Sequence, residues 1–132
     1  MRAKGFSLIE LIIVMAVMAV INMIMYPNFT SLQRSAKEVS AKSTARSVMV
    51  ALEQYYFLNQ SYPVASNGSI HGLLSDLFRA GLIDTIPNNP FTGQEYSDTD
   101  SSGKLVYRFV TLDTYQIQLY GSTNESVIFE YP

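Results

Sequence analysis

Residues 5–27 read GFSLIELIIVMAVMAVINMIMYP, and this stretch decides the fold of the 132-residue chain. Its apolar part, residues 6–26, would span about 31 Å as a helix, which matches the hydrocarbon core of a bilayer. Arg2 and Lys4 precede it, and basic residues favour the cytoplasmic side of a membrane. The pattern predicts one membrane-spanning helix with a cytoplasmic N-terminus and the rest of the chain outside.

A carboxylate interrupts this apolar stretch at Glu10. A charge at such a position costs about 2.5–3.5 kcal/mol unless it is paired or displaced towards the interface. The neighbouring side chains of the same helix carry no positive charge, so a counter-charge would come from another chain or from a new amino terminus. Cleavage between Gly5 and Phe6 would create that amine.

Two ordinary explanations of the N-terminus compete with this one. A secretory signal peptide has a shorter apolar part followed by a small-residue cleavage site, and the sequence after residue 26, PNFTSLQRSAKE, contains no such site. A simple uncleaved anchor explains the hydrophobicity and the basic residues. It does not explain Glu10.

The hexapeptide GFSLIE at residues 5–10, following a short basic leader, resembles the prepilin peptidase site of type IV pilins and type II secretion pseudopilins. The resemblance implies that the peptidase cuts after Gly5 and methylates Phe6. It also implies that Glu10 meets the terminal amine of a neighbouring subunit during assembly. Many pilins carry a proline where this chain has Pro27, and we expect a helix kink there because proline removes a backbone donor and clashes with the preceding turn.

The residue pattern of the remaining chain predicts a small α+β head. Apolar residues at three-to-four-residue spacing, including Val39, Ala45 and Leu52, continue the helix to about residue 58 as its apolar face. A short second helix is expected at 72–80. Prolines, glycines and asparagines make 59–68 and 86–104 loops. Three segments then predict an antiparallel meander, namely LVYRFVTL, YQIQLY and SVIFEY. One face of this sheet would pack on the long helix and cover Tyr107, Phe109, Ile117 and Leu119.

The loop at residues 90–96, PFTGQEY, partly resembles the Asp-Pro-Trp-Gly-x-x-Tyr loop of major pseudopilins. A related loop binds calcium in those proteins, so Asp98 and Asp100, with Glu95 nearby, are candidate calcium ligands. A solvated acidic loop is the alternative that we favour, because the residues lack EF-hand spacing.

Composition excludes several other functions. The net charge is −2 and no basic cluster occurs, so no direct nucleic-acid partner is expected. Cysteine is absent, and no nucleophile–base pair or phosphate-binding loop is present. His71 has no partner at motif spacing and is interpreted as structural. The sequence therefore predicts no enzyme and, calcium aside, no cofactor.

The resemblance implies a type IV pilin-like fold with a leader at 1–5, a transmembrane and filament-core helix at 6–26 and a globular head at 27–132. The expected function is that of a type II secretion pseudopilus subunit in the inner membrane, with its head in the periplasm. Expected partners are copies of itself and related subunits, prepilin peptidase and an inner-membrane assembly platform. The alternatives are a type IV pilus pilin and a single-pass anchored periplasmic binding module.

Overall fold

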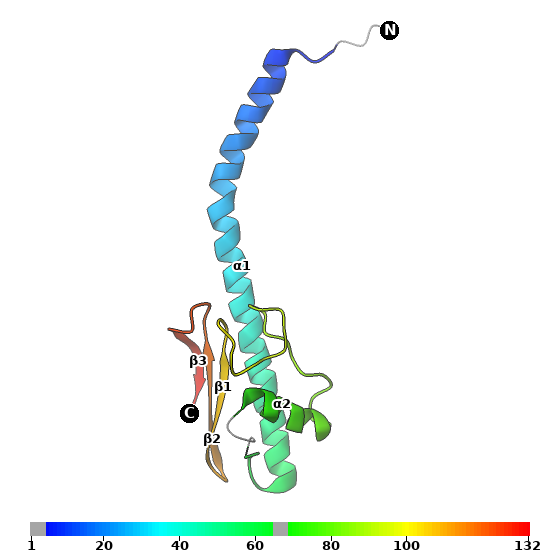
Figure 1. The fold of residues 1–132 in the computed structure, drawn as a ribbon, viewed down its shortest axis with the longest axis vertical. Helices are drawn as coiled ribbons and strands as arrows, with labels where there is room; N and C mark the ends of the chain where they lie inside the picture. Colours follow the sequence, from blue (N-terminus) through cyan, green and yellow to red (C-terminus); the bar gives the residue numbers. More distant parts are fainter. Residues whose placement is uncertain (1–4, 65–68) are drawn as a thin grey trace. The chain divides into compact units, whose positions relative to one another are not determined.

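The computed structural model describes residues 5–64 and 69–132. Along the chain they form helix α1 (Leu8–Asn59), helix α2 (Ile70–Arg79) and strands β1 (Leu105–Thr111), β2 (Thr114–Tyr120) and β3 (Val127–Tyr131) (Figure 1). The predicted α+β architecture is confirmed, and α1 ends one residue after its expected end. Most of the predicted leader, including Arg2 and Lys4, lies outside the described residues.

The chain divides into two compact units, the first ending at Ser35 and the second running from Ala36 to Pro132. We refer to the second as the head unit. The sequence predicts a different boundary, after residue 26, where the membrane-spanning segment is expected to end. That boundary stays a prediction.

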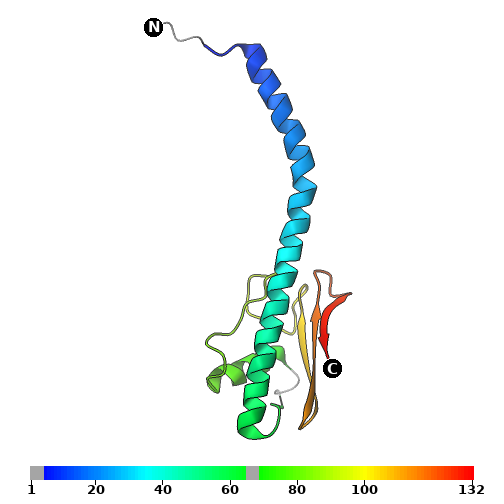
Figure 2. The same ribbon diagram turned by 180° about the vertical axis from the view of Figure 1, so that it is seen from behind.

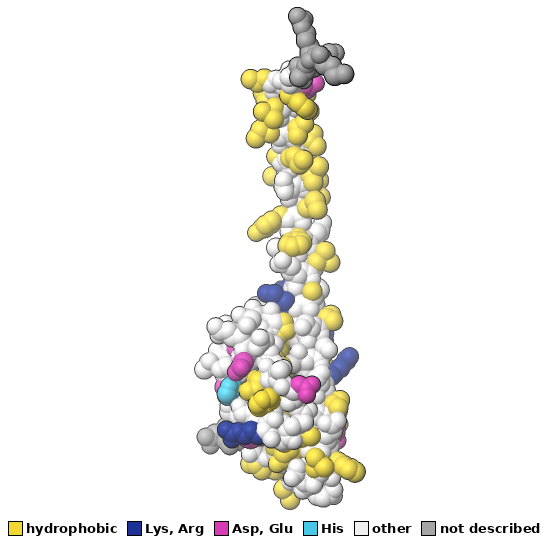
Figure 3. Space-filling view, turned by 90° about the vertical axis from the view of Figure 1, so that its right-hand side faces the viewer, with side chains coloured by type: hydrophobic (Ala, Val, Ile, Leu, Met, Phe, Trp, Pro, Cys, Tyr) yellow, Lys and Arg dark blue, Asp and Glu magenta, His cyan; other side chains and the backbone are white. Residues whose placement is uncertain are grey.

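In the first unit, α1 is apolar on every side. Its large hydrophobic side chains from Leu8 to Tyr26 are 45–81% exposed, and many hydrophobic side chains are visible on the face of this part of the helix that Figure 3 shows. By length and composition alone, α1 could cross a membrane. The helix continues without interruption through Pro27, so the proline does not unwind it, and the expected kink stays a prediction.

In the head unit, the three strands form one antiparallel sheet in the order β1-β2-β3. The sheet lies along one side of α1, and α2 with the loop that follows it lies on another (Figures 1 and 2). Leu105 pairs with Leu119, and Tyr107 with Ile117. All four side chains are buried, because alternate residues of a strand face the same side. Phe109, also expected on this face, is only half-buried.

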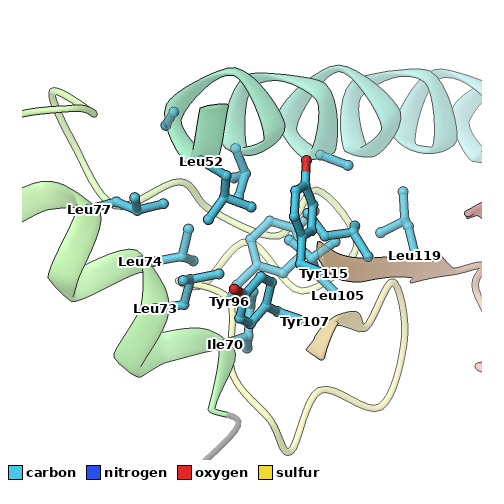
Figure 4. Packing of buried hydrophobic residues seen from close by; sticks show 14 of the residues in the cluster. Leu52, Ile70, Leu73, Leu74, Leu77, Tyr96, Leu105, Tyr107, Tyr115 and Leu119 are labelled. Carbon is cyan, nitrogen blue, oxygen red and sulfur yellow. The ribbon is translucent and has the colours of Figure 1, made fainter. Parts of the chain in front are cut away.

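The core fills the space between α1, α2 and the sheet (Figure 4). Small residues such as Ala41 and Ala45, together with Leu52, form the buried face of α1. Figure 4 shows the leucines of α2 and Tyr107 and Tyr115 of the sheet pointing into the same space. Val39, expected on the apolar face, is 68% exposed, because the buried stripe lies on another side of the helix.

Helix α2 begins two residues before its predicted start because of a cap and a distant contact. Ser69 is the N-cap, and its hydroxyl accepts a hydrogen bond from the Gly72 N–H at 3.3 Å. The Asp98 carboxylate accepts another from the Ile70 N–H at 2.9 Å. These two acceptors satisfy N–H groups that a helix start otherwise leaves unpaired.

Tyrosines tie the end of α1 to the sheet. The hydroxyl of Tyr62 donates to both Glu53 oxygens at 3.0 and 3.1 Å, and the Tyr115 hydroxyl donates to the same carboxylate at 3.3 Å. The Tyr62 and Tyr115 rings meet edge to face with centroids 4.5 Å apart. The Tyr107 hydroxyl donates to the Pro63 carbonyl at 2.8 Å.

This cluster predicts unfolding of the head unit in alkali. The pKa of Tyr62 is raised to about 12, mainly by burial and secondly by the Glu53 carboxylate. Burial also raises the pKa of Tyr107 and of Tyr115. In the unfolded chain these phenols would ionise near pH 10. Their contribution to stability is therefore complete below about pH 10 and is lost as the pH rises towards 12.

Tyrosinate absorbance and far-ultraviolet circular dichroism, recorded together from pH 8 to pH 13, test this expectation. The buried tyrosines should ionise in the same steep transition that removes the β-sheet signal. Ionisation of every tyrosine near pH 10 with the sheet signal unchanged would contradict the described packing.

Candidate processing and assembly site

The predicted cleavage site lies just before α1. Gly5, Phe6 and Ser7 are exposed and outside the helix, and the Phe6 side chain is 84% exposed. Exposed, non-helical backbone is where proteases act most readily. A Cβ atom added at Gly5 would have no atom within 4 Å. The fold itself therefore does not require glycine here, so any requirement for it would come from a partner such as a peptidase.

Glu10 has a partner that sequence reasoning missed. Its Oε2 accepts a hydrogen bond from the Ser7 backbone N–H at 3.0 Å. Ser7 immediately precedes α1, and Glu10 is the third residue of the helix, so this contact is the carboxylate half of a capping box. The sequence signal was present, because Ser7-Leu8-Ile9-Glu10 fits the S-x-x-E pattern before an apolar run. The structure thus brings Glu10 next to the predicted cleavage site within one chain.

A second polar residue in the apolar segment is also satisfied locally. The Asn22 side-chain amide donates to the Met18 carbonyl at 2.8 Å, and the Asn28 amide donates to the Ile24 carbonyl at 3.4 Å. In a membrane such groups are costly when unpaired. Each amide therefore pairs one of its N–H donors within its own helix, which lowers the cost of placing it in or near an apolar environment.

The loop that partly resembles the pseudopilin loop is organised by Asn89, which is fully buried. Its side-chain amide donates to the Asp100 carboxylate at 3.0 Å and to the Ser102 carbonyl at 2.8 Å, and its side-chain oxygen accepts from the Phe91 N–H at 2.9 Å. A buried amide is tolerated only with such partners. Tyr96, at the end of the resemblance, is also fully buried, so the loop is anchored at both ends.

The candidate calcium ligands already bind groups of the chain. Asp98 accepts from the Ser69 hydroxyl and the Ile70 N–H. Burial raises the pKa of Asp98, but these hydrogen bonds and the nearby Lys104 lower it overall below its usual value. Asp100 accepts from the Asn89 amide and from the Ser97 N–H at 3.1 Å.

Within residues 5–64 and 69–132, no three His, Cys, Asp or Glu side chains are grouped so that they could hold a metal ion. Glu95, the third acid of the prediction, lies 3.6 Å from His71 through Oε2 and Nε2, and both side chains are more than half exposed. Asp98 and Asp100 act as structural acceptors here. Calcium binding at these residues stays a prediction.

Comparison with known proteins extends the N-terminal resemblance to most of the chain. The family model "Prokaryotic N-terminal methylation motif" matches residues 1–26. The chain is 32% identical to prepilin peptidase-dependent protein A of Clostridium perfringens, over 80% of this chain and 83% of that protein. The similarity therefore continues far beyond the methylation motif.

Two further relatives represent the two kinds of filament that the sequence left open. Type II secretion system core protein G of Escherichia coli is 24% identical over 72% of this chain and 70% of that protein. Type IV major pilin protein PilA of Myxococcus xanthus is 32% identical over 50% of this chain and 30% of that protein. No solved structure matches the chain.

Proposed function

Because this chain belongs to the type IV pilin and pseudopilin family, we propose that it is a structural subunit of a type II secretion pseudopilus. Prepilin peptidase removes residues 1–5 and methylates Phe6. The apolar segment of α1 holds the subunit in the inner membrane, with its head unit in the periplasm, until an assembly platform moves it into the filament. The chain has no catalytic role of its own in this process, and it requires no cofactor.

We choose a pseudopilus over a type IV pilus because the match to core protein G covers most of both chains. That match covers 72% of this chain and 70% of the relative, whereas the match to PilA covers 30% of the pilin. The absence of cysteine also fits, because many type IV pilins close a C-terminal disulfide loop. The 32% identity to PilA favours a type IV pilus as the second candidate.

Deletion of the gene in its host separates the two filaments. For a pseudopilus subunit, proteins normally released by type II secretion should accumulate in the periplasm, while surface pili remain. Loss of surface pili or of twitching with unchanged secretion would favour the type IV pilus instead.

Substituting Gly5 by leucine should leave the protein uncleaved in the membrane. A Cβ atom added at Gly5 would have no atom within 4 Å, so the fold should be unchanged and only the peptidase should fail. Intact mass should then include residues 1–5, and N-terminal sequencing should begin at Met1.

The control is the wild-type chain in a host that lacks prepilin peptidase, where it should keep the same leader. A mature mass for the Gly5→Leu variant would refute the assigned cleavage site. A wild-type chain that starts at Met1 despite an active peptidase would instead support a single-pass anchored module.

A further inference from the structure

Helix α1 carries exposed apolar side chains just beyond the segment expected in the membrane. Among residues 28–40, every residue is polar except Phe29, Leu32, Ala36 and Val39. Spacings that alternate between three and four residues are the heptad pattern by which helices pair with helices. In the first unit Phe29 and Leu32 are 59% and 67% exposed, and in the head unit Val39 is 68% exposed. The described residues therefore leave this apolar pattern uncovered.

The same pattern extends towards the N-terminus through Asn22. This residue precedes Phe29 by seven positions, with Met25 between the two and Met18 before them. We refer to Met18, Asn22, Met25, Phe29 and Leu32 as the heptad row. All five side chains are exposed, and four of them are apolar. A single polar residue in such a row fixes the register and the number of the helices that pair.

The side chain of Asn22 has hydrogen-bonding groups left over. Its amide donates to the Met18 carbonyl at 2.8 Å, which uses one of its two N–H donors. Within residues 5–64 and 69–132, the second N–H and the side-chain oxygen of Asn22 have no partner. Unpaired polar groups are costly in hydrocarbon, so a membrane-held chain should gain from a partner at the depth of Asn22.

A second copy of this chain offers that partner. Copies inserted with the same topology are parallel, so each carries its Asn22 at the same depth. Two facing asparagines can exchange N–H···O bonds, which hold helices together in a membrane. A copy displaced by one step of the row would instead place Met18 or Met25 opposite Asn22, and a thioether sulfur is only a weak acceptor. The in-register pair is therefore the arrangement that satisfies Asn22.

The residues beside the row do not oppose association of two identical chains. In a parallel pair, the positions that flank the apolar row lie close to the flanking positions of the partner helix. Over residues 28–40 these positions are uncharged, namely Asn28, Gln33, Ser35 and Ser40. The charged residues of the same stretch, Arg34, Lys37 and Glu38, occupy the outer positions of the heptad. Two copies can therefore approach without like-charge repulsion at the contact.

The head unit leaves its own part of the pattern open. Ala41 is fully buried, whereas Val39 is exposed. At 3.6 residues per turn, two residues that are two positions apart lie about 160° from each other around a helix. The core of the head unit thus lies on the side of α1 opposite Val39, so a second helix can approach Val39 without displacing the head.

We infer that two membrane-held copies pair in parallel and in register along the heptad row, with Asn22 facing Asn22. The inference rests on the membrane insertion in the proposed function and goes beyond its filament. A two-fold contact uses the same surface on both copies and is closed, whereas a filament grows through contacts between different surfaces. The pair is therefore a stored form of the subunit, which must separate before either copy enters a filament.

Oxidation of single-cysteine variants tests the pair. Because the chain has no cysteine, Leu32→Cys would carry its only thiol. In a host that lacks the assembly platform, mild oxidation of membranes should convert this variant to a covalent dimer and nothing larger. Ser31→Cys is the matched control, because residue 31 is equally exposed but lies on another side of α1. It should give less dimer than Leu32→Cys, by about fivefold or more.

A second substitution tests the role of the asparagine. Asn22→Leu, made in the Leu32→Cys chain, should lower the dimer yield by about fivefold or more, because the bonds between helices are lost. Asn28→Leu, the same change beside the row, should not lower it. Equal dimer yields from the two cysteine variants, or a yield unchanged by Asn22→Leu, would overturn the inference and leave the proposed function intact. A chain absent from the membrane fraction would overturn the proposed function, and the inference with it.

Discussion

Substituting Glu10 by glutamine should abolish filament assembly and leave cleavage after Gly5 intact. Glu10 has two separable roles: it accepts the Ser7 N–H at 3.0 Å in one chain, and it is proposed to pair with the methylated amine of Phe6 in a neighbouring chain. A glutamine oxygen can still cap the helix. It cannot neutralise the amine.

The expected effect is large because the ion pair would form in an apolar filament core. Leaving one charge of a buried pair without its partner costs about 3–5 kcal/mol, which lowers the association constant of each subunit by about two to four orders of magnitude. Electron microscopy of sheared filaments, with mass spectrometry of the membrane fraction, would measure assembly and cleavage in the same cells.

Glu10→Val is the matched variant, because it removes the cap together with the charge. Both variants should be processed, and neither should assemble. Normal filaments from Glu10→Gln alone would mean that the cap, and not the charge, is what assembly needs. Normal filaments from both would refute the pairing altogether.

Substituting Gly103 by alanine should destabilise the head unit by about 2–5 kcal/mol, which is a large part of the stability of a small domain. Gly103 has a φ of +63°, and a Cβ there would lie 2.2 Å from Cδ2 of Phe91 and 2.8 Å from Oδ1 of Asn89. The left-handed backbone costs a non-glycine residue about 1–2 kcal/mol. Displacing the two neighbours adds about 1–3 kcal/mol, because Asn89 organises the loop.

Gly93 provides the control for this experiment. Its φ is +75°, yet an added Cβ would have no atom within 4 Å, so Gly93→Ala should show only the backbone cost. Urea unfolding of the two purified proteins in detergent, followed by tyrosine fluorescence, gives the difference. Equal losses of unfolding free energy would show that the contact with Phe91 and Asn89 is unimportant.

The sequence predicts best those elements that depend on residues close to one another along the chain. The apolar run and its three-to-four-residue continuation located the end of α1 to within one residue, and alternating residues with intervening turns located the three strands. The periodicity predicts the wrong side of the helix for Val39, because apolar spacing alone does not show which stripe of residues packs against the core. Here the small side chains of Ala41 and Ala45 let the core approach the helix.

What the sequence could not predict depends on contacts between distant residues. The start of α2 depends on Asp98, which is 28 residues beyond Ile70, and the buried role of Asn89 depends on Asp100 and Ser102. The same contacts explain why Asp98 and Asp100, which suggested calcium from composition, act as hydrogen-bond acceptors. At the candidate site the cleavage residues came from a local motif, and the cap between Ser7 and Glu10 was equally local but was overlooked.

The contacts that join the end of α1 to the β1–β2 turn determine how the head unit would bear mechanical load. Tyr62 donates its N–H to the Leu112 carbonyl at 3.0 Å, and the Tyr56 hydroxyl donates to Asp113 at 2.9 Å. Together with the tyrosine pair on Glu53, these bonds fasten the last turns of α1 to the sheet at several points. A pull along α1 would stretch these bonds at the same time, so the head unit should resist tension better than one whose bonds break in sequence.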